Sequence, residues 1–222
     1  MVETFLWYMG GKSHIKDWII RQFPKHTCYV EVFGGGASVL IAKRPSKIEI
    51  YNDKWGDIVN LFTQVRDNPD KLKRYLLLTP YSRQVFNEFV IKYRKREFRD
   101  NIERAAITFY LLNASVNGLI KSFSTISLRT LRRDRTRNKA KSYFRKVLLI
   151  DEVAERFRNV TIEKLDFRDV IKKYDSEGTL FYCDPPYLGT EDYYRGNFMF
   201  DDHIDLYNLL NTIRGKVVIS YY

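Results

Sequence analysis

The chain has 222 residues, of which 45% are hydrophobic; this is enough for a substantial core and excludes a wholly disordered protein. The 38 Lys and Arg against 27 Asp and Glu give a net charge of +11, which indicates a polyanionic partner but no particular reaction. Two distant cysteines and three scattered histidines predict neither a disulfide framework nor a zinc site. Because no apolar run approaches the length of a membrane span and no signal pattern opens the chain, we expect a soluble, cytoplasmic protein that contacts no membrane.

The first sixty residues alternate between strand-like and helix-like patterns. Residues 28–33 form an apolar run typical of a buried strand, glycines follow, and residues 37–42 begin a helix. A second strand is expected at residues 48–51 and a helix at residues 57–65, which Asn68-Pro69 should close. Such alternation predicts a parallel sheet with crossover helices.

The alternation stops between about residue 71 and residue 149. Helical stretches such as residues 101–113 and a long basic segment replace it. Strand patterns return at residues 160–163, 179–183 and 216–219, with a helical pattern at residues 205–213 between the last two. We therefore predict an α/β sheet domain, residues 1–60 and 158–222, interrupted by a mainly helical insertion, residues 61–157.

Most of the net charge belongs to one segment of the insertion. Residues 129–146 hold nine basic side chains and one acidic, so this segment supplies +8 of the +11. The basic residues are Arg129, Arg132, Arg133, Arg135, Arg137, Lys139, Lys141, Arg145 and Lys146. Polar residues are interleaved with them, a composition that suits phosphate contacts, although a solvated surface is the competing interpretation. The segment does not distinguish DNA from RNA.

The most specific motif is Asp184-Pro185-Pro186-Tyr187, directly after an apolar run that should be a central strand. Two consecutive prolines cannot continue a sheet ladder, so the strand must end in a stiff turn. Ligands of parallel α/β sheets bind at this carboxyl edge. A carboxylate, free carbonyl groups and a flat ring suit an amino group carried on a heterocycle. The competing interpretation is a turn whose aspartate only caps a helix.

A second motif, residues 31–38, places Gly34 and Gly35 after the first strand, where the backbone can approach a ligand. Asp53, at the end of the next strand, is placed to accept hydrogen bonds from ribose hydroxyls. A dinucleotide fingerprint would need glycine where Val39 stands, so an NAD oxidoreductase is weakly supported. Residues 10–13, Gly-Gly-Lys-Ser, resemble the end of a phosphate loop, but such a loop requires a first glycine at position 6, where Leu6 stands.

In this order the motifs resemble those of the Dam-like N6-adenine-specific DNA methyltransferases, the D12 class of the alpha group, over nearly the whole chain. The similar segments are residues 8–12, the glycine-rich residues 31–38, Asn52-Asp53, residues 165–167, and, in full, the tetrapeptide Asp184 to Tyr187. Residues 113–119 are similar to a segment near the family's target-recognition region.

The resemblance implies a Rossmann-like sheet that binds S-adenosylmethionine and an inserted target-recognition module that binds double-stranded DNA. Tyr187 would stack on an adenine turned out of the duplex, and Asp184 with the Pro185 carbonyl would accept hydrogen bonds from its amino group. No metal is implied. The cofactor residues would be Tyr8, Lys12, Phe33, Gly34, Gly35, Asp53 (on the ribose), Asp166 (on the adenine amino group), Phe167 and Asp184. The DNA-binding residues would be Asn117, Arg129, Arg132, Arg133, Arg135 and Arg137.

The sequence departs from the family pattern in three places. Val32 stands where the family usually has proline, Ala37 replaces a glycine, and the chain stops at Tyr222, where the family continues with further strands. A sheet edge is therefore expected to be missing, which would leave an exposed strand open to self-association or to a partner. A methyltransferase for RNA or a protein amide and a non-catalytic DNA-binding remnant remain alternatives, and a restriction endonuclease is a further expected partner.

Overall fold

The computed structural model describes residues 4–125, 138–188 and 198–221. Contacts divide the chain into two compact units. The sheet unit contains Gly10–Val59 and Arg158–Tyr222, and the helical unit contains Glu3–Met9 and Asn60–Phe157. We predicted residues 1–60 as part of the sheet domain, whereas the contacts assign Glu3–Met9 to the helical unit.

The sheet unit is built on five parallel strands in the order β3-β2-β1-β4-β5. The strands are β1 (Cys28–Glu31), β2 (Ile48–Asn52), β3 (Val160–Glu163), β4 (Thr179–Cys183) and β5 (Lys216–Ile219). Cys28 pairs with Ile48 on one side and with Thr179 on the other, so β1 and its neighbours start in register and reach the carboxyl edge together. The predicted parallel α/β sheet, its five strands included, is confirmed.

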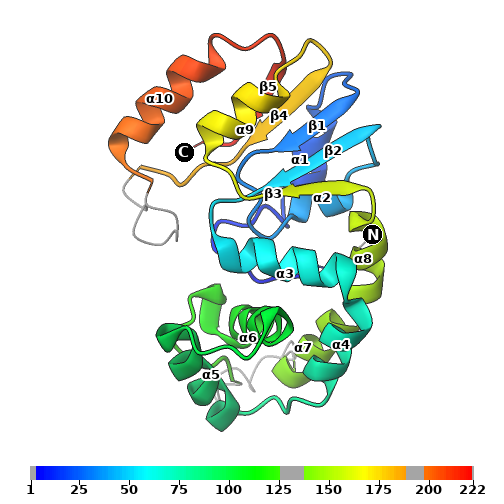
Figure 1. The fold of residues 1–222 in the computed structure, drawn as a ribbon, viewed down its shortest axis with the longest axis vertical. Helices are drawn as coiled ribbons and strands as arrows, with labels where there is room; N and C mark the ends of the chain where they lie inside the picture. The colour runs from blue at the N-terminus through cyan, green and yellow to red at the C-terminus, as the bar shows by residue number, and fades with distance from the viewer. Residues whose placement is uncertain (1–3, 126–137, 189–197, 222) are drawn as a thin grey trace, which may run out of the picture. The chain divides into compact units, whose positions relative to one another are not determined.

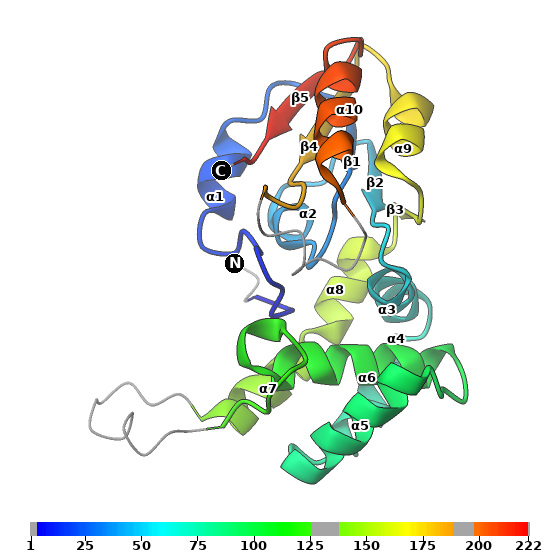
Figure 2. The same cartoon turned by 90° about the vertical axis from the view of Figure 1, so that its left-hand side faces the viewer.

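Helices cover both faces of the sheet (Figures 1 and 2). They are α1 (Lys16–Arg21), α2 (Ser38–Ala42), α9 (Phe167–Tyr174) and α10 (Phe200–Leu210). On the α9 and α10 face, Val30, Ile50 and Phe181 point from the strands into one apolar cluster with Val170 and other residues of the helices. Because strand side chains alternate, Tyr29 and Tyr182 point the other way, and both rings pack on Phe23 beyond α1.

The buried helix of the helical unit is α6 (Asn101–Ala114), in which every residue from Ala105 to Ala114 is buried. The elements of this unit are α4 (Pro69–Leu77), α5 (Arg83–Lys95), α6, the 3₁₀ turn Val116–Gly118, α7 (Lys139–Leu148) and α8 (Ile150–Phe157), and α3 (Gly56–Asp67) spans the division between the units. Asp100 caps α6 by accepting from the Glu103 backbone N–H at 2.8 Å. Burial opposes ionisation of Glu103, but hydrogen bonds from the Arg99 backbone and from Lys92 lower its pKa to about 2.

Two helices begin at other residues than predicted, and local contacts explain the difference. The helix expected from residue 37 begins at Ser38, because Ala37 is left-handed with φ 54°. As predicted, α3 ends directly before Asn68-Pro69, at Asp67; Pro69 then occupies the first turn of α4, where its missing N–H is tolerated. The helix expected at residues 205–213 is α10, which begins earlier because the Asp202 carboxylate accepts from the Met199 backbone N–H at 2.7 Å.

The remaining features concern edges and membranes. β5 is an edge strand of the described sheet, and most of its side chains are exposed. Self-association through this strand stays a prediction.

Among the described residues, no helix combines the length and apolar character that crossing a bilayer requires. Both cysteines are buried and free.

Candidate active site

The carboxyl ends of β1, β2 and β3 are tied together by Asn52. Its amide nitrogen donates to the carbonyl oxygens of Val32 at 2.9 Å and Leu165 at 3.2 Å, and its amide oxygen accepts from the Leu165 N–H at 2.8 Å. The side chain is 1% exposed, so these bonds are shielded from water. The loops that leave the three strands therefore have fixed starting points.

The glycine-rich loop lies directly against β2. A Cβ atom on Gly34 would come within 2.2 Å of the Tyr51 ring, so only glycine fits there. The Tyr51 hydroxyl donates to the Gly35 carbonyl at 2.8 Å, and the Gly35 N–H donates to the Asp53 carboxylate at 2.7 Å. Ala37 adopts the left-handed conformation in which the family has a glycine, and the loop accommodates it.

The Asp53 carboxylate is held by backbone donors alone among the residues whose contacts are described. One oxygen accepts from Gly35, and the other accepts from the Trp55 N–H at 2.7 Å. Burial raises the pKa of Asp53 to about 6, although these two bonds favour the ionised form. Since a carboxylate offers about four acceptor positions, about two remain for hydroxyl donors.

The tetrapeptide motif leaves β4 at the same edge, where Asp184 meets Lys12. The Lys12 ammonium is 2.6 Å from one Asp184 oxygen and 2.7 Å from the Gly10 carbonyl oxygen. The Tyr187 hydroxyl donates to the other Asp184 oxygen at 3.1 Å, and the ammonium also lies over the Tyr187 ring, 5.1 Å from its centroid. With Lys12 and Asp184 side chains only 10% and 17% exposed, this ion pair is largely shielded from solvent.

A second carboxyl group, Glu31, lies near this pair. Burial raises the pKa of Glu31 to about 8; the Asp184 charge acts in the same direction, and the Tyr29 hydroxyl bond at 3.0 Å opposes both. Glu31 is therefore largely protonated at pH 7. Burial also raises the pKa of Asp184, whereas the Lys12 ammonium lowers it. The pairing with Lys12 thus favours the anionic form of Asp184.

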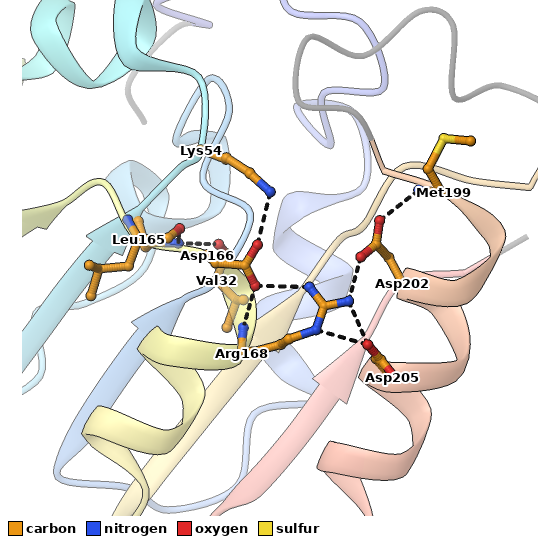
Figure 3. Close-up of polar contacts among 9 residues, drawn as sticks. Val32, Lys54, Leu165, Asp166, Arg168, Met199, Asp202 and Asp205 are labelled. Carbon is orange, nitrogen blue, oxygen red and sulfur yellow. Dashed lines mark hydrogen bonds and ion pairs between the residues drawn. The ribbon is translucent and has the colours of Figure 1, made fainter.

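Asp166 follows β3 at this edge and caps α9 (Figure 3). Its carboxylate accepts from the Arg168 backbone N–H at 3.0 Å and from the Lys54 ammonium at 2.9 Å. Partial burial opposes ionisation, but these partners lower the pKa of Asp166. The neighbouring Phe167 ring packs on Phe33, with 5.8 Å between the ring centroids. The segments around Phe33, Asp53, Asp166 and Asp184 therefore share one edge.

The other predicted site residues are not brought to this edge by the described contacts. Tyr8 belongs to the helical unit. Asn117 also lies there, exposed, with φ 54°. Arg129, Arg132, Arg133, Arg135 and Arg137 lie outside the described residues. Lys146, counted in the basic segment, is buried and donates to Asn113 at 2.8 Å, so it supports the interior of the helical unit.

Three ionisable residues of the edge received no role from the sequence: Glu31, Lys54 and Arg168. Glu31 opens the predicted motif of residues 31–38 and Lys54 follows Asp53, but the contribution of each comes from burial or from a partner distant in sequence. Arg168 lies two residues after Asp166, the aspartate that caps α9. This spacing indicated a functional role only weakly, because an arginine in the first turn of a helix also occurs on ordinary helix surfaces.

Sheet order, the glycine-rich loop and the acid-Pro-Pro-Tyr turn together define a Rossmann-like methyltransferase. The family described as D12 class N6 adenine-specific DNA methyltransferase matches residues 8–222. The chain belongs to this family, whose activity is methylation of adenine in DNA; the predicted family, fold class and kind of enzyme are confirmed.

Named relatives agree with the family assignment. The chain is 30% identical to a DNA adenine methylase of Serratia marcescens, over 98% of this chain and 83% of the relative. It is 27% identical to the type II methyltransferase M1.LlaDCHI of Lactococcus lactis subsp. cremoris, over 98% of this chain and 79% of the relative. With the DNA adenine methylase of Escherichia coli (strain K12) the identity is 29%, over 83% and 65%.

Proposed function

We propose that this chain transfers the methyl group of S-adenosylmethionine to the N6 nitrogen of an adenine turned out of duplex DNA. The observation that carries the proposal is Asp184: a shielded carboxylate at the end of a central strand, paired with Lys12 and next to the Tyr187 ring. This geometry presents an acceptor for an amino group beside a surface for a heterocycle.

The donor and acceptor chemistry of the edge fits the cofactor. Asp53 retains acceptor positions for the two ribose hydroxyls, and Asp166 retains one for the adenine amino group. The partly exposed Phe33 ring offers apolar surface for the adenine ring, and the buried Phe167 ring packs against Phe33. Gly34 and Gly35 keep the loop free of side chains. Lys12 completes the proposed set in the sheet unit, although its ammonium donates to Asp184 in the structure; Tyr8, in the helical unit, stays a prediction from the family resemblance.

Bound S-adenosylmethionine supplies an electrophilic methyl group. Asp184 and the Pro185 carbonyl would accept the two amino hydrogens of the adenine, which raises electron density on its nitrogen and directs the lone pair. Pro186 stiffens the turn and Tyr187 stacks on the base. As the new nitrogen–carbon bond forms, the methyl–sulfur bond of the donor would break with its electron pair left on sulfur, S-adenosylhomocysteine would be the leaving product, and one amino proton would leave to solvent. Catalysis then rests on positioning and electrostatics more than on proton abstraction.

The experiment is methyl transfer from tritiated S-adenosylmethionine to unmethylated duplex DNA. We expect label on N6 of adenine, and we expect Asp184→Ala to abolish it while DNA retention on a filter persists. Asp67→Ala is the matched control, since Asp67 is a carboxylate on α3 paired with the adjacent Arg66. Cofactor-dependent label on RNA or protein, with none on DNA, would overturn the proposal. DNA retention without any cofactor binding would identify a non-catalytic remnant.

We also assign the DNA contact to the basic segment of residues 129–137, on its charge. Neutralising Arg132, Arg133 and Arg135 with Gln should lower the slope of log affinity against log salt by up to about 3, since each phosphate contact contributes about 0.9. Neutralising Arg21, Arg44 and Lys47, exposed on the sheet unit, removes the same charge and should leave the slope nearly unchanged. Equal slopes for the two triple variants would refute the assignment.

A companion restriction endonuclease stays a prediction, motivated by the name of the Lactococcus relative. An endonuclease gene beside this one, whose product is blocked by DNA methylated with this chain, would support it. A cytoplasmic location also stays a prediction, which the two free, buried cysteines favour.

A further inference from the structure

An ion network joins three segments of the sheet unit at the carboxyl edge (Figure 3). Lys54 comes from the loop after β2, Asp166 and Arg168 come from the start of α9, and Asp202 and Asp205 come from the first turns of α10. Figure 3 shows the Arg168 guanidinium between Asp166 on one side and the two α10 carboxylates on the other. The proposed catalytic steps give Arg168 no task.

The Arg168 guanidinium is anchored on α10. Its Nη2 donates to Asp202, and Nη2 and Nε both donate to one Asp205 oxygen at 2.6 and 2.9 Å. An arginine has five donors in a rigid plane, so these bonds leave its remaining Nη1 pointing in a fixed direction. That nitrogen donates to Asp166 at 3.1 Å.

The same guanidinium lies over the Phe167 ring, with Cζ 4.2 Å from the ring centroid. Phe167 in turn packs on Phe33 and on Phe198, with ring centroids 5.8 and 5.5 Å apart. Arg168 thus contacts both residues that follow β3 and were assigned to the adenine of the cofactor, one by an ion pair and one by a cation–π contact.

The hydrogen bonds on Asp166 leave little freedom in its carboxylate. One oxygen accepts twice from Arg168, from the backbone N–H and from Nη1, and the other accepts from Lys54. With three of about four acceptor positions filled, the last one has a set direction. The Asp166 side chain is 25% exposed, so that position is accessible to a ligand. An acceptor oriented in advance loses less entropy when a ligand binds.

We propose that Arg168 is a positioning residue: anchored by Asp202 and Asp205, it orients the Asp166 carboxylate and the Phe167 ring for the adenine of the cofactor. This inference rests on the proposed function, in which Asp166 accepts from the adenine amino group. It predicts that the preference of the protein for a ligand with the adenine 6-amino group, over one without it, depends on Arg168. This dependence is separate from any effect of Arg168 on the stability of the fold.

The test is a binding cycle in which one change is made in the protein and one in the ligand. Dissociation constants are measured by calorimetry for S-adenosylhomocysteine and for its purine analogue without the 6-amino group. The unmodified protein should prefer the amino form by about tenfold or more, because the hydrogen bond ends on a charged acceptor. Arg168→Met should reduce this preference at least threefold and change the affinity for the deamino analogue by less than about twofold.

The control is Arg214→Met. Arg214 hydrogen-bonds to Asp175, at the other end of α9, and its loss should leave the preference unchanged. Arg168→Lys, which keeps the charge but cannot reach three carboxylates at once, should retain part of the preference. Asp205→Asn keeps the Arg168–Asp166 pair but loosens its anchor, and it should also lower the preference; these two variants carry the test if Arg168→Met does not fold.

The outcomes separate this inference from the proposed function. A preference near one in the unmodified protein would remove the assigned role of Asp166 and the inference with it. An undiminished preference in Arg168→Met would overturn only the positioning role. Equal loss of affinity for both ligands would also overturn it, since that pattern indicates a structural role.

Discussion

Lys12 is expected to set the pH range in which Asp184 works. The two charged atoms are 2.6 Å apart, and at an effective dielectric constant of about 20 their gross attraction is about 6 kcal/mol. Part of this offsets the cost of removing both charges from water, and breaking such buried pairs costs about 3–5 kcal/mol. The Lys12 ammonium lowers the pKa of Asp184 against the effect of burial, so removing the ammonium should raise this pKa.

Lys12→Met should therefore move the acidic limb of the pH profile of kcat/KM to higher pH. The sign follows from the chemistry: only the anionic Asp184 accepts a charge-assisted hydrogen bond from the adenine amino group, and without the ammonium Asp184 holds its proton to higher pH. Activity lost at pH 7 should return partly at alkaline pH. The assay is initial-rate methylation across pH 5 to 10, with S-adenosylmethionine saturating and DNA below its KM.

Two variants control for other effects. Lys12→Arg keeps the charge and should keep the limb within about one unit of the original. Lys43→Met breaks another buried pair of the sheet unit, Lys43–Glu49, whose side chains are 3% and 4% exposed, and should lower stability without moving the limb. An unmoved limb in Lys12→Met, or an equal shift in Lys43→Met, would refute the electrostatic argument.

Three further predictions follow from buried polar groups. Because burial raises the pKa of Asp53 to about 6, the affinity for S-adenosylhomocysteine should fall as the pH drops from 7 to 5, and calorimetry on Asp53→Asn should find that dependence gone. Glu103, with its pKa lowered from 4.5 to about 2, stabilises the fold by roughly 3 kcal/mol above pH 4.5 and loses this as the pH falls through 2, so Glu103→Gln should lose that amount in urea unfolding at pH 7 and nothing near pH 2. Tyr143→Phe should be neutral or stabilising by up to about 1 kcal/mol, because the buried hydroxyl has no hydrogen-bond partner among the described residues; Tyr110→Phe, whose hydroxyl bonds to Pro80 and Ser82, should destabilise, and the reverse ranking would refute this.

The sheet was predictable because its signal is local. The strands β1, β2 and β4 are short runs of mostly apolar residues, and a glycine or a polar residue ends or closely follows each of them in the sequence. The turn at Asp184 was predictable for the same reason, since two prolines end a strand wherever they occur. Boundary errors arose where one side chain decides the end of a helix, as Asp202 does for α10.

The partners of the charged residues were not predictable, because they depend on the fold. Lys12 and Asp184 are 172 positions apart, and Lys54 and Asp166 are 112 positions apart. Lys12 therefore resembled a ligand-binding lysine in the sequence, and its contact with Asp184 emerged only when the chain was folded. Lys146 shows the opposite case: it was one of nine cations in a basic segment, yet it is buried beside Asn113.

Four carboxyl groups lie at the carboxyl edge and would repel one another if all were ionised without partners. Each of them has a different environment: they belong to Glu31, Asp53, Asp166 and Asp184. Glu31 holds a proton, Asp184 is paired with Lys12, and Asp166 is paired with Lys54 and Arg168. Asp53, like Glu31, has no ion-pair partner in the described structure, and its carboxylate relies on two backbone N–H groups. As the pH falls from 7 to 5, protonation of Asp53 should therefore weaken the ribose contact, whereas the cationic partners of Asp166 favour its charged form and preserve the adenine contact.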